Sequence, residues 1–466
     1  MRKLILLTIL CSYFGSCFSQ IQDNSAVVGS WFGTLKVQGV SLRIVFSISE
    51  KDGVLVTTLD SPDQGARGLP TESTSFSGTE ILIKMPAMYA QYKGNVEDSV
   101  TIKGIFSQSG SEFPLELSKQ TSVVEKGTPA VQDPNAGKYT STEVKFRNEQ
   151  ANITLAGTVT YPEGKTNCPV AILLTGSGAQ DRDETLFEQK PFLRIADRLS
   201  ANGIAVLRFD DRGVAQSEGD IRTATSYDFV TDALAAYEYM KNYPGIDSEK
   251  IGFIGHSEGA SLAVMAAAEN KDIAFIVMLA GPTISGDAIL CLQAAAIARA
   301  QGAGEDAIKA DYEMRSGIYS IIKNEQDDEK ASAQIAEYMN GLPNYSDDQR
   351  KILVDAFVKG VLNPWMRAFI SLDPAPYIGK VTCPVVAFWG SKDLQVPAKE
   401  NIDALMKIIY KHKKNNFSIV NVTGVNHLFQ DAETGLVTEY SNTEKAVMND
   451  DTLDKIQDWI NNYLLK

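Results

Sequence analysis

The chain has 466 residues, of which 44% are hydrophobic and 22% charged, and its formal net charge is −14. This length predicts two or three domains, and the composition is that of a globular protein with a sizeable core. A strongly acidic chain repels the phosphates of nucleic acids and anionic membranes, so we expect neither as a partner.

The first residues have the pattern of an export signal. Arg2 and Lys3 precede a short apolar run, and small residues follow it. The run is too short to span a bilayer, so we expect residues 1–19 to be a signal peptide and the protein to be periplasmic or extracellular. Lipid anchoring through Cys17 is the alternative, because residues 14–17 loosely resemble a lipidation motif. No later apolar run reaches ~18 residues, so no membrane span is expected.

Residues 20–120 are predicted to form an all-β domain. Short runs that alternate between apolar and polar residues are separated by turn sequences such as Lys51-Asp52-Gly53. Strands of this kind at a spacing of about 8–12 residues are typical of an antiparallel barrel or sandwich. Residues 121–140 are rich in Thr, Pro, Gly, Asn and Asp, which is the composition of a linker.

From residue 141 to 466 the pattern changes to apolar strands that alternate with helices. The buried strands are predicted at 170–174, 204–207, 251–254, 275–280 and 385–389. Helices are predicted over 192–199 and 226–239, the second with Ser226 as its N-cap. This alternation predicts an α/β domain with a mainly parallel sheet and helices on both faces.

Residues 283–380 interrupt this alternation. They are amphipathic and contain no clear strand. We expect an inserted helical lid, and the alternative is that part of the segment is an enlarged connecting helix. The candidate helices cover 289–298, 307–322, 331–339 and 347–361.

The sequence Gly255-His256-Ser257-Glu258-Gly259 lies between a buried strand and a helix of small residues. This is the strand–turn–helix context of a nucleophile elbow. Glycine permits the tight turn, and the start of the helix favours negative charge that develops at the serine. Ser257 is therefore the candidate nucleophile.

A serine hydroxyl needs a base, and the chain has only three histidines. His256 lies inside the tight turn and points wrongly for that role, while His412 lies in a solvated basic run. His427 follows an apolar strand and is the candidate base.

The imidazole in turn needs an acid that fixes its tautomer. Asp393 comes just after the strand that ends at Trp389, and it lies between Ser257 and His427 in the chain. This order of serine, aspartate and histidine is the one expected for such an elbow. Asp373 precedes its strand, which places it at the wrong end of the sheet.

An oxyanion hole needs two backbone N–H groups. One is expected from Glu258, the residue after the nucleophile, and the other from Ser177 in the loop after the first buried strand. Two acidic clusters, at 181–184 and 210–213, follow strands at the same end of the sheet. They are predicted mainly to form ion pairs, such as Arg182 with an aspartate of the second cluster.

Direct substrate contact is the alternative for Asp181. The uncharged Gln180 and Gln395 lie close to the candidate residues in sequence and are further candidates for substrate binding. Five cysteines fall to an odd number after signal cleavage, which argues against a disulfide framework. None has the spacing of a metal site, so we expect no metal.

Five motifs together resemble exported bacterial serine esterases of the α/β-hydrolase superfamily that carry a small N-terminal β domain. They lie at 176–183, 208–213, 255–259, 390–397 and 425–430, and the stretch 61–66 is similar to the β domain. The resemblance covers nearly the whole mature chain. It implies an α/β-hydrolase fold and a Ser-His-Asp esterase acting on small, short-chain esters without a cofactor, and it transfers these roles to Ser257, His427 and Asp393.

Two other functions remain as alternatives. A serine peptidase would use the same residues, but ~95 residues of β structure cannot form the propeller of some peptidases, whose blades need ~40–50 residues each. The second is a protein that binds carbohydrate or lipid and has an inactive hydrolase core. The natural substrate and the oligomeric state do not follow from the sequence.

Overall fold

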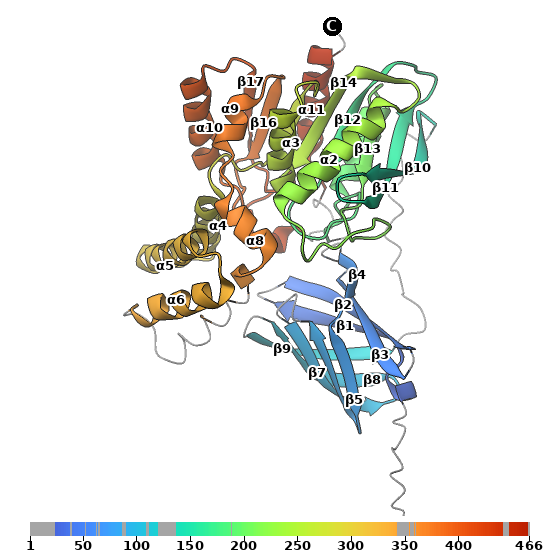
Figure 1. The fold of residues 1–466 in the computed structure, drawn as a ribbon, viewed down its shortest axis with the longest axis vertical. Coiled ribbons are helices and arrows are strands. Elements are labelled where there is room, and N and C mark those ends of the chain that lie inside the picture. Colours follow the sequence, from blue (N-terminus) through green and yellow to red (C-terminus); the bar gives the residue numbers. More distant parts are fainter. Residues whose placement is uncertain are drawn as a thin grey trace, which may run out of the picture.

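The computed structural model describes residues 24–464, apart from 38–39, 52, 62, 64–65, 86–89, 109–110, 120–136, 188, 343–353, 355–357, 359 and 441–446. The expected signal peptide, Cys17, most of the expected linker and most of the expected helix 347–361 lie outside the described residues. The chain forms a nine-stranded sheet followed by an eight-stranded sheet. Figure 1 shows them as two bodies, here called the β domain (24–119) and the α/β domain (137–464).

The β domain is a strongly curved antiparallel sheet. Its strands are β1 (Gly29–Val37), β2 (Val40–Lys51), β3 (Val54–Ser61), β4 (Ala66–Pro70), β5 (Ser73–Ser77), β6 (Glu80–Met85), β7 (Ala90–Asp98), β8 (Thr101–Gln108) and β9 (Ser111–Lys119). They pair in the order β4-β3-β2-β1-β9-β8-β7-β6-β5. Thr74 of β5 donates a hydrogen bond to Thr57 of β3 at 2.7 Å, which nearly closes the sheet. Trp31, Phe46 and Tyr92 fill its interior.

The α/β domain has strands β10 (Tyr139–Asn148), β11 (Ile153–Pro162), β12 (Cys168–Leu174), β13 (Ala205–Phe209), β14 (Ile246–His256), β15 (Ile276–Leu279), β16 (Val385–Gly390) and β17 (Phe417–Val422). They pair in the order β10-β11-β13-β12-β14-β15-β16-β17. β10 and β11 form an antiparallel hairpin, β11 also pairs antiparallel with β13, and the other pairs are parallel. Neither strand of this hairpin was predicted from the sequence, and β10 begins inside the expected linker.

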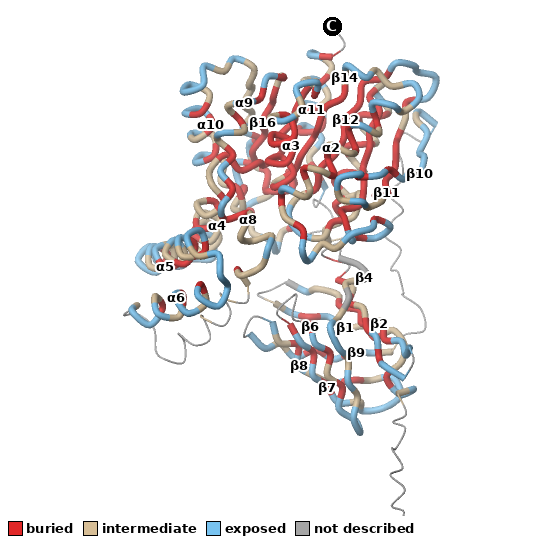
Figure 2. Tube along the Cα trace, viewed as in Figure 1, coloured by how far each residue is buried: buried red, intermediate tan, exposed pale blue. Residues whose placement is uncertain are grey.

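Helices cover both faces of this sheet. On one face lie α1 (Pro191–Ser200) and α11 (Asp450–Leu464), and on the other α2 (Ser226–Lys241), α3 (Glu258–Glu269), α9 (Ala375–Lys380) and α10 (Ala398–His412). Side chains of β12 alternate between the two cores: Ile172 packs with the second group and Leu173 with the first. Figure 2 shows the resulting band of buried strands. Burial of one such side chain contributes about 1.5–3 kcal/mol, which explains why the central strands are apolar on both faces.

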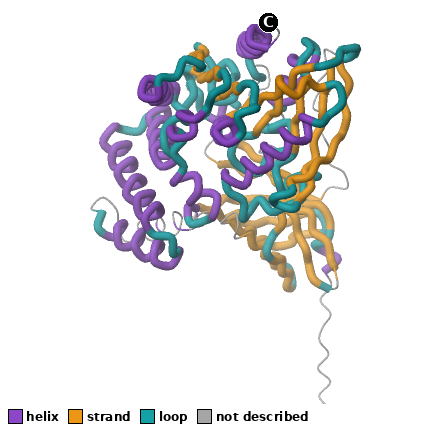
Figure 3. The backbone as a smooth tube through the Cα atoms, turned by 45° about the horizontal axis from the view of Figure 1, so that its top comes forward, coloured by secondary structure: helices purple, strands orange, loops and turns teal. Residues whose placement is uncertain are grey.

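A helical insertion, defined here as residues 283–380, lies between β15 and β16. It contains α4 (Gly286–Ala300), α5 (Glu305–Asn324), α6 (Asp328–Asn340), α8 (Pro364–Ser371) and also α9. Ile318, Ile335 and Ile370 are fully buried in a small core of its own. Figure 1 shows α5 and α6 to one side of the sheet, with α4 and α8 between them and the strands, and Figure 3 shows these helices from a second direction.

The N-cap of α2 lies one residue before Ser226, the cap expected from the sequence. Thr225 is the cap, and its hydroxyl and N–H both contact the carboxylate of Asp228, at 2.7 and 2.9 Å, in a capping box. Ser226 is the first residue of the helix, which leaves its hydroxyl free of capping. It donates a hydrogen bond of 2.5 Å to Glu258 instead.

The β domain touches the α/β domain through a loop. The N–H of Phe187 donates to the carbonyl oxygen of Asp63 at 2.6 Å. Arg43 on β2 fixes Asp63 with its backbone N–H and its guanidinium, at 2.6 to 2.9 Å from the carboxylate oxygens. The carboxyl ends of β12 and its parallel neighbours thus face the β domain (Figure 1).

None of the helices in the described ranges has both the length and the apolar character needed to cross a bilayer. Cys168, Cys291 and Cys383 are buried, and each is a free thiol.

Candidate active site

Ser257 stands at a sharp turn between β14 and α3. Its φ of 53° and ψ of −119° lie in a sparsely populated region for a residue with a side chain, as in a nucleophile elbow. Its N–H donates to the carbonyl oxygen of Leu279 at 2.8 Å, which holds the turn. A Cβ on Gly255 or on Gly259 would lie 2.1 Å from a backbone oxygen, so both positions must be glycine.

His427 and Asp393 form a buried pair. The Nδ1 atom of His427 lies 2.8 Å from a carboxylate oxygen of Asp393, and the two side chains are 5% and 0% exposed. The other oxygen accepts the N–H groups of Gln395 and Val396 at 2.8 and 2.9 Å. A carboxylate only accepts hydrogen bonds, so Nδ1 carries the proton and Nε2 of a neutral ring keeps its lone pair. This arrangement suits a general base.

The residues on either side of the elbow bring the serine, the histidine and the loop after β12 together. The rings of His256 and His427 have centroids 4.7 Å apart. A Cβ on Gly176 would lie 3.3 Å from Ser257 Cβ and 3.5 Å from His256 Nδ1. Ser257, His427 and the loop after β12 therefore lie close together at the carboxyl end of the sheet.

The loop of residues 175–180, here called the oxyanion loop, is held at both ends by one carboxylate. Asp211 accepts a 2.6 Å hydrogen bond from the Thr175 hydroxyl and a 2.9 Å bond from the Gln180 N–H. Burial raises the pKa of Asp211 well above its ordinary value, with nearby Asp232 and Glu258 adding to the effect. These contacts of Asp211 could not be predicted from the sequence, because they span more than thirty positions.

The oxyanion loop also supplies candidate N–H donors. The N–H of Gly176 is taken, since it donates to Glu184 at 2.8 Å. Ser177 and Glu258, the two residues expected from the sequence, have N–H groups that donate to no acceptor within the described residues. Glu258 is the first residue of α3, where helical amides lack a partner in the preceding turn.

The side chain of Glu258 has a role that sequence reasoning missed. It is buried and accepts hydrogen bonds from the Ser226 hydroxyl and from the indole N–H of Trp365 on α8. Burial raises the pKa of its carboxyl, and these two hydrogen bonds oppose the shift. The helical insertion is thus anchored on the residue beside Ser257.

Residues 189–334 match a sequence family described as serine aminopeptidase, S33, and this segment includes the elbow. This match supports a hydrolase of the α/β-hydrolase type. The hydrolase is 27% identical to esterase EstD of Thermotoga maritima over 315 residues, which is 67% of each chain. It is also 26% identical to a monoglyceride lipase homolog of monkeypox virus, over 28% of this chain and 42% of that one.

Solved structures with a similar outline share little sequence. Est1E of Butyrivibrio proteoclasticus, solved with ferulic acid, is 17% identical and has a TM-score of 0.42, over 69% of this chain and all of that one. The α/β hydrolase GrgF from Penicillium is also 17% identical, with a TM-score of 0.45 over 70% of this chain and all of that one.

The acidic clusters of the hydrolase brace its loops. Arg182 makes a bidentate pair with Asp210, at 2.7 and 3.0 Å, which is the kind of ion pair expected from the sequence. One oxygen of Asp181 accepts three hydrogen bonds from Asp183 and Thr185 in its own loop. Within the described ranges, no group of three or more His, Cys, Asp or Glu side chains is placed to hold a metal ion.

The two glutamines expected near the substrate differ in their surroundings. Gln180 donates to the Ser177 carbonyl at 3.3 Å, but its amide oxygen is buried and has no partner among the described residues. Gln395 instead accepts from Gln293 on α4 at 3.2 Å and donates to Tyr440 at 3.0 Å. It therefore ties the insertion to the loop that carries Asp393.

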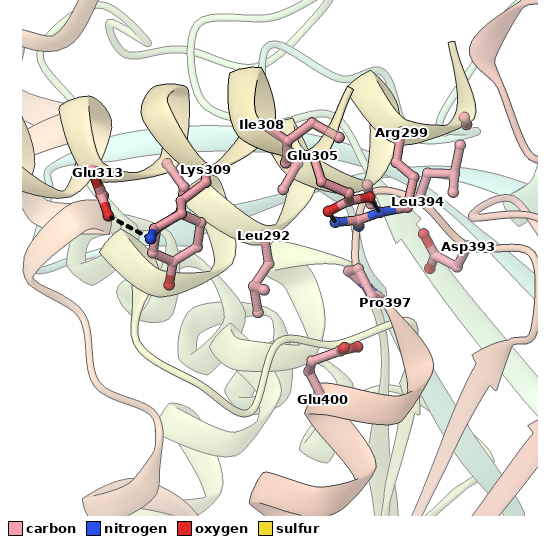
Figure 4. Close-up of a pocket in the computed structure, with 14 residues that line it drawn as sticks. Leu292, Arg299, Glu305, Ile308, Lys309, Glu313, Asp393, Leu394, Pro397 and Glu400 are labelled. Atoms are coloured by element: carbon pink, nitrogen blue, oxygen red, sulfur yellow. Dashed lines mark hydrogen bonds and ion pairs between the residues drawn. The ribbon is translucent and has the colours of Figure 1, made fainter. Parts of the chain in front are cut away.

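A groove of about 860 Å³ lies between α4, α5 and the loop after β16. Figure 4 shows Leu292, Ile308 and Leu394 among its lining side chains, with Asp393 at one end. Neither Ser257 nor His427 lines it. The groove therefore adjoins the candidate site at Asp393.

Proposed function

We propose that the protein is a serine hydrolase that cleaves carboxylic esters through an acyl-enzyme. The observation that carries the proposal is the buried His427–Asp393 pair, joined by 2.8 Å, at the sheet edge where Ser257 occupies its strained turn. Ester hydrolysis is supported by the names of the relatives, an esterase and a monoglyceride lipase homolog.

In the proposed mechanism, Ser257 attacks the ester carbonyl while Nε2 of His427 takes its proton. Asp393 stabilises the imidazolium that forms, and the N–H groups of Ser177 and Glu258 stabilise the oxyanion. His427 then protonates the leaving alkoxide. Water repeats the sequence on the acyl-enzyme and releases the acid.

The size of the substrate is a separate part of the proposal. We propose small esters with short acyl chains, since the large groove is not lined by Ser257 or His427. The buried, unpartnered amide oxygen of Gln180 would accept a hydrogen bond from a hydroxyl or amide of the substrate.

The second candidate function is an aminopeptidase, which the description of the matching family favours. Such an enzyme needs a carboxylate that can bind the α-ammonium group of a peptide. The carboxylates of Asp181, Glu184 and Glu258, which lie on the loop after β12 and beside Ser257, each already accept hydrogen bonds from the protein. This favours the ester over the peptide.

Hydrolysis of p-nitrophenyl esters from acetate to decanoate tests the function directly. Wild type should turn over the short esters fastest, and Ser257→Ala should lose turnover. Ser261→Ala is the matched control, because the Ser261 hydroxyl lies in the same helix, is buried and has no partner in the described chain. Retained turnover in folded Ser257→Ala would refute the assignment of the nucleophile.

Two further measurements separate the alternatives. A fluorophosphonate probe should label wild type and Ser261→Ala but not Ser257→Ala, whatever the natural substrate. Aminoacyl p-nitroanilides should be poor substrates. If they react faster than every ester, the aminopeptidase replaces the esterase as the proposed function.

We also propose that the chain is exported after removal of residues 1–19. Fractionation of cells that express the full chain should place the protein outside the cytoplasm. Cys17→Ser should leave this unchanged for a cleaved signal peptide, whereas loss of membrane association in that variant would indicate a lipid anchor.

A further inference from the structure

Glu184 and His256 form a second buried pair behind the proposed catalytic residues. The Oε1 atom of Glu184 lies 2.8 Å from Nδ1 of His256 and accepts the N–H of Gly176 at 2.8 Å. The two side chains are 2% and 6% exposed. Glu184 has a φ of 53°, a left-handed backbone that is costly for glutamate and that is held here by the surrounding contacts.

The other ring nitrogen of His256 reaches the loop of the proposed base. Nε2 lies 3.0 Å from the backbone carbonyl oxygen of His427. A carbonyl and a carboxylate can only accept, so both ring nitrogens of His256 must carry a proton if Glu184 is ionised. Burial lowers the pKa of His256, but the charge of Glu184, the hydrogen bonds to Glu184 and to the His427 carbonyl, and the charge of Asp393 outweigh it and raise this pKa.

This pair joins three loops whose relative positions matter to the proposed mechanism. Glu184 fixes the oxyanion loop at Gly176, His256 belongs to the elbow, and its Nε2 fixes the backbone of His427. We propose that Glu184 and His256 are positioning residues, and that His256, with a proton on each ring nitrogen, holds His427 and the oxyanion loop against each other. The proposal rests on the proposed function.

A buried charged pair of this kind is effective only while both members remain. Loss of the carboxylate would leave one ring proton, which cannot serve both Nδ1 and Nε2 at once. Either the contact with residue 184 or the bond to the His427 carbonyl would then be lost, so the link between the two loops would break. A displacement of about 1 Å at a reacting group can cost ~10²-fold in rate.

Two variants separate the two ends of the pair. His256→Asn can still donate to Glu184 but no longer reaches the His427 carbonyl. Glu184→Gln retains an oxygen for the Gly176 N–H but removes the charge. Each should lower kcat by ~10²-fold with little change in KM, because the substrate contacts remain. His412→Asn, on the exposed end of α10, is the matched control and should keep wild-type kcat.

The charge itself can be read in the wild-type protein. The chain has only three histidines, so ¹⁵N and ¹³C imidazole spectra can be assigned with the two histidine variants. We expect His256 to be protonated on both nitrogens at pH 8. A neutral His256 ring at pH 8 would overturn the proposal even if the variants fail to fold.

The kinetic experiment can also contradict the proposal. A kcat close to that of the wild type in both folded variants would show that the pair has no positioning role. Failure of the proposed function looks different, because wild type itself would then not hydrolyse esters or react with the fluorophosphonate probe.

Discussion

The indole nitrogen of Trp365 lies 3.1 Å from both carboxylate oxygens of Glu258. Glu258 provides a proposed oxyanion donor through its backbone and holds the insertion through its side chain. The position of α8 and the start of α3 are therefore coupled by a single residue.

Trp365→Phe should lower stability and turnover together. The change keeps an aromatic ring but leaves the buried Glu258 with the Ser226 hydroxyl alone, which costs about 1–3 kcal/mol. Urea denaturation measures the stability loss. Trp459→Phe is the control, since the buried indole N–H of Trp459 has no partner in the described chain. Equal losses in the two variants would mean that the Trp365 hydrogen bond adds nothing.

The stability of Glu258→Gln relative to wild type should increase as pH rises. Because the folded-state pKa of Glu258 is raised above its ordinary value of 4.5, the folded protein binds this proton more tightly than the unfolded chain. Wild type thus loses stability as pH rises from about 4.5 through the folded pKa, and glutamine does not titrate. The comparison is urea denaturation of both proteins at pH 5 and pH 8.

The difference between the two pH values cancels any constant cost of the altered hydrogen bonds. Removal of the Glu258 charge also eases the ionisation of Asp211, which acts in the same direction. Glu305→Gln is the control. The hydrogen bond from Arg299 lowers the pKa of Glu305, so the contribution of this carboxylate to stability no longer changes once the pH is above its ordinary pKa. A Glu258→Gln effect that is identical at both pH values would contradict the raised pKa.

Arg43→Met should weaken the contact between the two domains. The guanidinium of Arg43 holds Asp63, whose carbonyl accepts the N–H of Phe187 in the loop that also carries Glu184. We expect kcat/KM to fall by ~10-fold or less, which corresponds to about 1.4 kcal/mol. Lys93→Met removes an exposed ion pair elsewhere in the β domain and should change nothing. If both variants behave like wild type, the β domain does not act on the site through Asp63.

Gly259→Ala should disrupt the elbow. Its Cβ would lie 2.1 Å from the carbonyl oxygen of Leu174, the last residue of β12, so the strand or the helix must shift. Overpacking of this kind costs about 1–3 kcal/mol or more, and the serine would move with the helix. Thermal unfolding and ester turnover both report on it. Gly304→Ala has open space around it and an ordinary φ of −71°, so it should leave both unchanged.

The strand segments next to the elbow could be predicted because they lie in the core. β12, β16 and residues 251–256 of β14 are buried, which gives apolar runs. The edge strand β10 was missed for the opposite reason: Ser141, Thr142 and Glu143 are exposed, so it shows little alternation. The cap of α2 was misplaced although the sequence Thr225-x-x-Asp228 carries the signal of a capping box.

The residues of the candidate site likewise divide into those that local sequence can predict and those that depend on distant contacts. Ser257, Asp393 and His427 could be proposed because each follows an apolar strand and few histidines compete. The role of Glu184 could not, since it depends on a turn that brings it back across 72 positions to His256. Gln395 was expected at the substrate from its position near Asp393, but sequence distance does not show that Gln293 and Tyr440 engage its amide.

The hold of Asp211 on both ends of residues 175–180 has a thermodynamic consequence. A loop fixed in this way loses its conformational entropy when the chain folds, so an incoming substrate does not have to order it. The free energy of binding is then available for the acyl and alcohol groups themselves. Substrates with few contacts, for which the ordering of a loop would be prohibitive, gain most from such a site.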